Sequence, residues 1–145
     1  MPIVDNLGAP ELPWRPNYRV WAVAGQDETV DCTLHYSTIE PGAGAPLHTH
    51  ETDELIVVLE GQLNGVLGDQ RQMVETNQTM VIPKGVPHGF TAAGPTTART
   101  LAFFPTRDGM QRTAYLEGKP PKVYQKDSPS SVIPSPLINR GVQRG

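Results

Sequence analysis

Between residues 29 and 105 the chain alternates short apolar or β-branched runs with turns that contain glycine and proline. Such runs are typical of β-strands, because β-branched and aromatic side chains fit a pleated, half-buried surface. The runs that we expect as strands cover residues 29–39, 54–60, 63–67, 72–74, 79–82, 88–92 and 98–104. Their spacing of roughly 8–12 residues predicts an all-β sandwich or barrel.

We expect residues 1–28 to form an N-terminal arm outside this barrel. Four prolines among the first 16 residues fix φ and remove backbone donors, so the arm should be extended rather than helical. Trp14, Tyr18 and Trp21 should anchor it by packing on the edge of the barrel, and contact with a ligand is the alternative.

Residues 106–145 form the expected C-terminal extension. Residues 110–116 suit either a short helix or a strand, and residues 119–145 form a Pro-rich irregular tail. Four hydrophobic side chains in this tail predict that it docks on a surface: Val132, Ile133, Leu137 and Ile138.

Composition and charge narrow the function. The 145 residues suit one domain, and a net charge of −3 argues against a nucleic-acid partner, which requires a basic surface. No run of 18 apolar residues and no leader-like N-terminus occurs, so we expect no membrane partner. The only cysteine is Cys32, which excludes an intrachain disulfide and predicts a reducing, cytoplasmic location.

The charge is unevenly distributed along the chain. Residues 1–104 contain 5 basic and 12 acidic side chains, whereas residues 105–145 contain 7 basic and 3 acidic ones. A basic tail can lie on an acidic body, either its own or that of a second copy. Together with exposed sheet edges, this charge pattern leads us to expect a homodimer.

Three of the four histidines lie in two stretches with metal-ligand character. His48 and His50 are two residues apart, so in a strand both imidazoles face the same side, and Glu54 opens the next strand. His88 follows a turn rich in proline and glycine. Three neutral imidazoles and a carboxylate can converge on one divalent transition metal: Fe, Mn, Ni, Co, Cu or Zn. Surface or purely structural histidines are the alternative.

The first of these stretches resembles the first motif of the cupin superfamily, G-x5-H-x-H-x3,4-E-x6-G. Gly42, His48, His50, Glu54 and Gly61 match every position of that motif.

The second stretch resembles the second cupin motif, G-x5-P-x-G-x2-H-x3-N. Pro83, Gly85 and His88 match it, while Asn77 replaces the first glycine and Ala92 replaces the last asparagine. Asparagine tolerates positive φ, so Asn77 suits the turn, and the change at Ala92 removes no ligand.

The resemblance covers residues 29–105 and implies a double-stranded β-helix, the cupin form of the jelly roll. It also assigns the metal-ligand role to His48, His50, Glu54 and His88. One fold supports many functions, so the motifs do not specify the reaction.

Three further residues are candidates for catalysis or substrate binding. His35 suits a structural role, or an acid–base role if a bulge turns it inward. Tyr36 suits core packing, or a hydrogen bond to substrate. Arg99 suits an ion pair or a solvent-facing position, or a bidentate contact with a substrate carboxylate.

A set of apolar side chains should line the barrel or its second sheet and favour a small, partly apolar organic substrate. The set is Ile56, Val58, Met80, Ile82, Phe90, Leu101 and Phe103.

The leading functional hypothesis is a metal-dependent enzyme that acts on a small organic molecule, with dioxygenation first and lyase or isomerase chemistry second. The bound metal would act as a Lewis acid or oxygen-activating centre, and Glu54 would serve as ligand and possible base. A non-catalytic protein that binds a small ligand is the alternative class.

Overall fold

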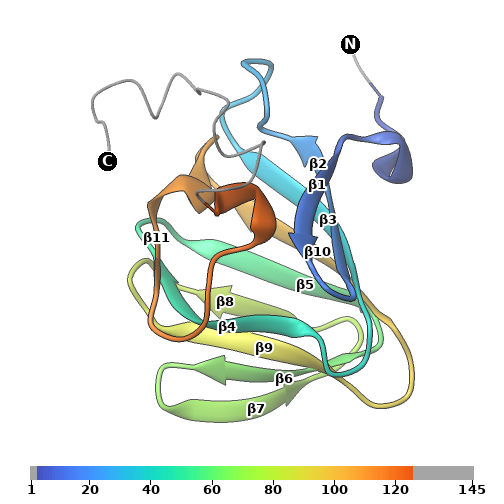
Figure 1. The fold of residues 1–145 in the computed structure, drawn as a ribbon, viewed down its shortest axis with the longest axis vertical. Helices are drawn as coiled ribbons and strands as arrows, with labels where there is room; N and C mark the ends of the chain where they lie inside the picture. The colour runs from blue at the N-terminus through green and yellow to red at the C-terminus, as the bar shows by residue number, and fades with distance from the viewer. Residues whose placement is uncertain (1–2, 126–145) are drawn as a thin grey trace.

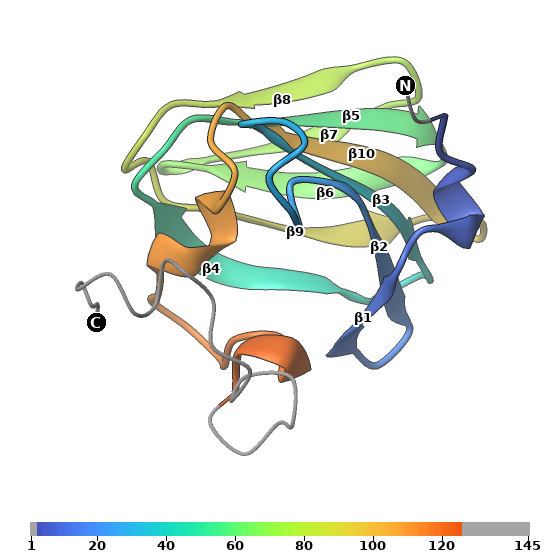
Figure 2. The same ribbon diagram turned by 90° about the horizontal axis from the view of Figure 1, so that it is seen from above.

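The computed structural model describes residues 3–125, which form two antiparallel β-sheets that face each other (Figures 1 and 2). In spatial order, the six-stranded sheet contains β1 (Glu11–Arg15), β2 (Tyr18–Ala24), β3 (Thr33–Ile39), β10 (Ala98–Phe104), β5 (Glu54–Glu60) and β8 (Thr79–Ile82). The five-stranded sheet contains β11 (Thr113–Tyr115), β4 (Gly44–His50), β9 (His88–Ala93), β6 (Gln62–Leu67) and β7 (Gln70–Val74). Three short 3₁₀ helices complete the described part: η1 (Asn6–Gly8), η2 (Gly109–Arg112) and η3 (Lys122–Tyr124). The expected all-β fold is confirmed.

The core lies between the two sheets and follows the two-residue alternation of the strands. In β5 the side chains of Glu54, Ile56 and Val58 point inward and are buried, whereas Leu55 is exposed. In β8, Met80 and Ile82 point inward in the same way. The core therefore forms where alternating apolar residues of both sheets meet.

Strand β10 has one face toward the interior and one on the outer side of the six-stranded sheet. Phe104 is fully buried, while Leu101 packs with Trp21 and Tyr36 in a second cluster on the outer side of the six-stranded sheet. The sequence leaves open which face Leu101 and Phe103 take, and the structure places Leu101 on the outer one. Small and polar residues such as Thr100 take inward positions of β10, so the polarity of its residues does not indicate which face of the strand is buried.

The segment expected as an N-terminal arm forms a hairpin, β1–β2, that extends the six-stranded sheet. Strand β2 pairs with β3 from Tyr18↔Ile39 to Ala24↔Leu34, so the backbone is extended as expected but part of the sheet. The hairpin lies at the opposite end of the molecule from the β6–β7 hairpin (Figure 1). Trp21 packs on the outer face against Tyr36, whereas Trp14 and Tyr18 reach the interior.

The described residues after β10 turn back across one end of the two sheets (Figures 1 and 2). They form η2 and then β11, which pairs with β4, and they end at η3 beside β1. The predicted docking of Val132, Ile133, Leu137 and Ile138 lies outside the described residues. Within residues 3–125, no helix has the length and apolar character needed to cross a membrane.

Several turns in the motif regions have left-handed backbone, and two of them connect the sheets. Gly61 has φ 81° and ends β5, and Asn77 has φ 69° in the turn before β8. The expectation that Asn77 replaces glycine at a positive φ is confirmed. Both residues sit at turns that return the chain from one sheet toward the other.

Candidate metal centre and cavity

Four buried side chains converge from three strands at one end of the space between the sheets. His48 and His50 lie on the inward face of β4, and His88 opens the neighbouring strand β9, where it pairs in register with His48. Glu54 opens β5 in the facing sheet. One ligand atom from each of the four lies within 4.8 Å of the others, so the expected cluster is formed.

The turns that lead into these strands hold each other in place. The Gly85 amide donates to the carbonyl oxygen of His50 at 2.9 Å, and the Lys84 amide donates to Oδ1 of Asp53 at 2.8 Å. These bonds join the turn before Glu54 to the turn before His88. The local sequence therefore positions ligands that are far apart along the chain.

Hydrogen bonds at the outer ring nitrogens fix the tautomer of His48 and His88. Nδ1 of His48 lies 2.6 Å from the carbonyl oxygen of Pro46, and Nδ1 of His88 lies 3.0 Å from that of Val86. A carbonyl oxygen only accepts, so both Nδ1 atoms carry a proton. In this tautomer the uncharged form of each ring presents its Nε2 lone pair to the cluster.

A side chain fixes the tautomer of His50 in the same way. Its Nδ1 lies 2.8 Å from Oγ1 of Thr113, whose hydroxyl donates to the carbonyl oxygen of Met110 at 2.8 Å. Because the hydroxyl proton is used there, Oγ1 accepts from Nδ1–H of His50. Hydrogen bonds of this kind orient imidazoles that ligate metals.

The centre of the cluster needs a positive charge. Oε1 of Glu54 lies 3.1 Å from Nε2 of His50 and 3.1 Å from Nε2 of His88, and all three residues are buried. Nε2 of His50 is a buried atom with no hydrogen-bond partner among residues 3–125. Lone pairs and a carboxylate at this separation are stable with a shared proton or a bound cation between them. The donor set therefore fits a divalent transition metal.

Burial and mutual contact set the protonation of the ligands. Burial, with the nearby His88 and His50, lowers the pKa of His48 to about 3. Burial acts to raise the pKa of Glu54, but its contacts with the His50 and His88 imidazoles outweigh this effect and lower the pKa to about 2. At neutral pH these ligands are a neutral imidazole and a carboxylate, which are the forms that bind a metal.

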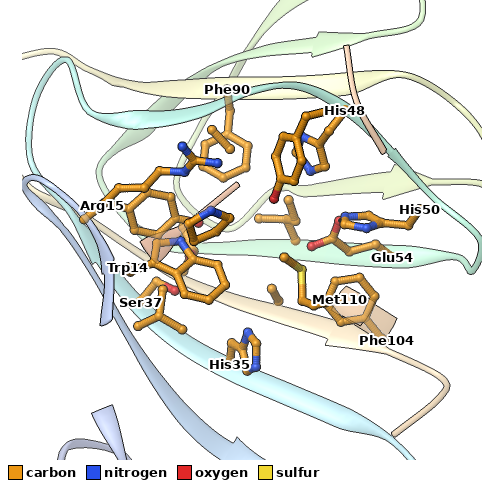
Figure 3. A pocket seen from close by; sticks show the side chains of 18 residues that line it. Trp14, Arg15, His35, Ser37, His48, His50, Glu54, Phe90, Phe104 and Met110 are labelled. Atoms are coloured by element: carbon orange, nitrogen blue, oxygen red, sulfur yellow. The ribbon is translucent and has the colours of Figure 1, made fainter. Parts of the chain in front are cut away.

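A cavity extends from the cluster toward the β1–β2 hairpin (Figure 3). Its volume is about 30 Å³, and its walls include Trp14, Tyr18, Ile56, Phe90 and Phe104. These walls are mostly apolar or aromatic. A small number of polar side chains, among them His48, His50 and Glu54, interrupt them. This composition is typical of a small-molecule site.

Of the three further candidates from the sequence, only His35 lines the cavity. It is 5% exposed on the inward face of β3, and its ring contacts Trp14 and Phe104 edge-on. Burial lowers the pKa of His35 to about 4, so it is a neutral imidazole at pH 7. Regular alternation places it there without the bulge that we expected to be necessary.

Tyr36 and Arg99 lie on the outer face of the six-stranded sheet, where Tyr36 packs and Arg99 forms an ion pair, and not at the cavity of the alternative interpretation. Nε of Arg99 donates to Glu60 at 2.6 Å, and its Nη1 donates to the Tyr36 hydroxyl at 3.1 Å. Neither residue lines the cavity. The alternation of β3 and β10 places His35 and Thr100 inward, and therefore turns Tyr36 and Arg99 outward.

Sequence reasoning missed several residues that the structure brings to the site. Arg15 and Tyr115 line the cavity, and Thr113 orients His50. All three lie in the flanking segments, outside the two motifs. The only sequence signal was the aromatic cluster around Arg15, for which ligand contact was the weaker of two interpretations.

The cupin resemblance found in the sequence agrees with comparisons to known proteins. A family model described as "Cupin domain" matches residues 35–104. No curated protein sequence matches the chain. Among solved structures, the polyketide cyclase RemF from Streptomyces resistomycificus is 22% identical with a TM-score of 0.69, and the match covers 90% of each chain.

Two further structures have the same fold. KdgF from Halomonas sp. is 24% identical with a TM-score of 0.62, over 73% of this chain and 94% of that one. Salicylate 1,2-dioxygenase from Pseudoaminobacter salicylatoxidans is 16% identical with a TM-score of 0.61, over 72% of this chain and 30% of that one. Similarity at these identities shows the fold, and the activity must be argued from the site.

Proposed function

The chain belongs to the cupin superfamily, and on that premise we propose that it is a metal-dependent enzyme acting on a small organic molecule in the cavity between its sheets. The observation that carries this proposal is the convergence of three imidazoles whose outer nitrogens are all committed to hydrogen bonds. A protein that needed these histidines only for packing would not require every Nε2 lone pair to face one buried carboxylate.

His48, His50, Glu54 and His88 would hold the metal. When bound, a divalent transition metal supplies a Lewis acid and, if redox-active, a site for oxygen activation. Glu54 contributes the only negative charge of the donor set, and its second oxygen makes it a possible base. The aromatic and apolar walls exclude water and so strengthen electrostatic interactions within the cavity.

Dioxygenation is the reaction that we propose first, with dioxygen as second substrate and both of its atoms entering the organic product. The apolar walls suit dioxygen and a flat, partly apolar substrate. A dioxygenase is among the proteins that have this fold.

Proton transfer, as in a lyase or isomerase, is the second reaction class, and His35 supports it. Its imidazole lies in the cavity, is neutral at pH 7 and does not belong to the ligand cluster. Such a group can take a proton from one carbon of a substrate and return it to another. A polyketide cyclase shares this fold over most of both chains.

Metal analysis followed by turnover measurements tests the proposal. Protein purified without added metal should contain one transition metal per chain, and His48→Ala with His50→Ala should lose it while keeping its β-structure by circular dichroism. Undiminished metal in that double variant would contradict the metal assignment.

The reaction class is then tested on a panel of small organic acids, phenols and ketones. Oxygen uptake that matches product formation supports dioxygenation, and equal turnover with and without oxygen supports proton transfer. A metal-loaded protein that binds members of the panel but turns over none of them would support the non-catalytic alternative.

The expected homodimer also stays a proposal. Strand β8 ends the six-stranded sheet, and on its outer face Val81 is 60% exposed and pairs in register with Leu55, which is 37% exposed. Apolar side chains at an open strand edge support association of two copies. A monomer by light scattering at micromolar concentration would contradict it.

A further inference from the structure

Arg15 places a positive charge in the wall of the cavity. One edge of its guanidinium has no hydrogen-bond partner among residues 3–125. It is the last residue of β1, and in Figure 3 its side chain reaches into the cavity from the side opposite His50 and Glu54. Its Nε and Nη2 atoms are buried, and no group within residues 3–125 accepts a hydrogen bond from either. A buried guanidinium left unpaired is unfavourable, so this edge is suited to an anionic partner.

The same hairpin shows what that edge of an arginine binds. On the exposed side, Nε and Nη2 of Arg19 hold the two carboxylate oxygens of Glu11 at 2.9 and 2.7 Å. This is the bidentate arrangement in which the planar guanidinium matches a planar carboxylate. The Arg15 side chain lines the cavity, the same two of its atoms are buried without an acceptor, and no carboxylate of residues 3–125 lies within ion-pair distance of it.

Arg15 is also connected to the metal-ligand cluster by stacked groups. Its guanidinium lies over the Tyr115 ring, 5.6 Å from the centroid, and that ring stacks on His48 at a centroid distance of 5.3 Å. Tyr115 therefore holds the guanidinium beside the cluster, and the Nε–Nη2 edge keeps no hydrogen-bond acceptor within residues 3–125. Glu54, the carboxylate of the cavity, is engaged by His50 and His88 instead.

We propose that Arg15 binds the carboxylate of an organic-acid substrate, and that the rest of this substrate extends from Arg15 toward the His48–His50–Glu54–His88 cluster. The substrate class is thus a small carboxylic acid with an apolar body, in keeping with the aromatic walls of the cavity. This inference rests on the proposed function, because it names the substrate class of the same site. It does not depend on which reaction follows.

A purely structural role for Arg15 makes a different prediction. If Arg15 served only to pack on Tyr115, its replacement would change stability but not the preference between an acid and a neutral molecule of the same shape. Ligand selectivity therefore separates the two roles.

The experiment compares two pairs of probes that differ in charge but hardly in shape: acetate with acetamide, and benzoate with benzamide. Binding is followed by amide chemical shifts in NMR titrations of the full chain, both metal-loaded and after removal of metal with a chelator. The variants are Arg15→Gln, Arg15→Lys and, as matched control from the same hairpin, Arg19→Gln. Circular dichroism and metal content verify that each variant is folded and loaded.

Wild-type protein should prefer the acid of at least one pair. Arg15→Gln should weaken acid binding about ten- to hundredfold and leave amide binding unchanged, because a charge-assisted bidentate pair is lost. Arg15→Lys should keep part of the preference through its charge, and Arg19→Gln should behave as wild type.

Three results would overturn the inference. They are equal acid binding by Arg15→Gln and wild type, an equal loss in Arg19→Gln, and failure of wild type to bind either acid at millimolar concentration. If chelation abolishes acid binding and Arg15→Gln leaves it unchanged, the metal rather than Arg15 holds the carboxylate. The inference then fails while the proposed function stands. If the chain takes up no metal but Arg15 still selects acids, the proposed function fails and the inference stands.

Discussion

Replacing Thr113 by valine should weaken metal binding although Thr113 touches no metal ligand atom. In β11, Thr113 pairs in register with His50, and its hydroxyl links Nδ1 of His50 to the carbonyl oxygen of Met110 through two 2.8 Å hydrogen bonds. Valine has nearly the same shape but cannot accept from Nδ1–H. The imidazole then loses the contact that fixes its tautomer and orientation.

The size of the effect follows from the kind of contact that is lost. Removal of a hydrogen-bond partner behind a metal-ligating histidine typically lowers metal affinity about 10- to 100-fold, which corresponds to about 1.4–2.8 kcal/mol. His48 and His88 keep their backbone partners, so one imidazole of three is affected. We therefore expect weakened rather than abolished binding.

Competition with a coloured chelator measures the affinity of wild type and Thr113→Val for Zn²⁺ and Co²⁺. Thr113→Ser keeps the hydroxyl and should retain most of the wild-type affinity. The control is Thr91→Val, at an exposed position of β9. Equal affinity of Thr113→Val and wild type would refute the reasoning, as would an equal loss in Thr113→Ser.

Three further predictions follow from burial and backbone contacts. Gly44→Ala should destabilise the fold by more than about 3 kcal/mol in urea titrations, because its Cβ would overlap the carbonyl oxygen of Phe90, whereas Gly8→Ala should be nearly neutral. The free energy of unfolding of the metal-free wild type should fall by about 3 kcal/mol more than that of His35→Gln between pH 6.5 and pH 4. The reason is that unfolded His35 binds its proton near pH 6.5, whereas folded His35 binds it only near a pKa of about 4. The same pH dependence of the unfolding free energy in both proteins, measured by urea titration, would contradict this. Glu54→Gln should lower turnover on the order of 10²-fold or more if Glu54 is the base, and full turnover at full metal occupancy would remove that role.

The side of the sheet on which each residue lies was only partly readable from the sequence. The apolar alternation of β5 and β8 correctly predicts Ile56, Val58, Met80 and Ile82 as interior residues. In β10 the large apolar residues Leu101, Phe103 and Phe104 occupy both faces, so the sequence left the face open, and Phe104 is the buried one. The interior positions of β10 that border the cavity include the small or polar Thr100 and Ala102, while Leu101 on the outer face packs with Trp21 and Tyr36, so neither face has the polarity that a simple two-sided sheet would have.

The sequence by itself determined strands β3 and β5–β10, and the turn residues and the four-residue cluster of the two motifs, because these depend on short-range patterns. His48, His50 and Glu54 lie within seven residues of one another, and the alternation of a strand is enough to direct both imidazoles of β4 to one side. Asn77 at a positive φ is likewise a local requirement that a single residue type reveals.

Only the tertiary structure decided which residues outside the motifs complete the site. Arg15 comes from the first strand, and Thr113 and Tyr115 come from the last one; they meet the cluster because the hairpin extends one sheet and β11 pairs with β4 in the other. Pairing between distant segments depends on the packing of the whole chain and has no short-range pattern in the sequence. The charge and hydrogen bonds that these residues bring to the site therefore became visible only once the two sheets were assembled.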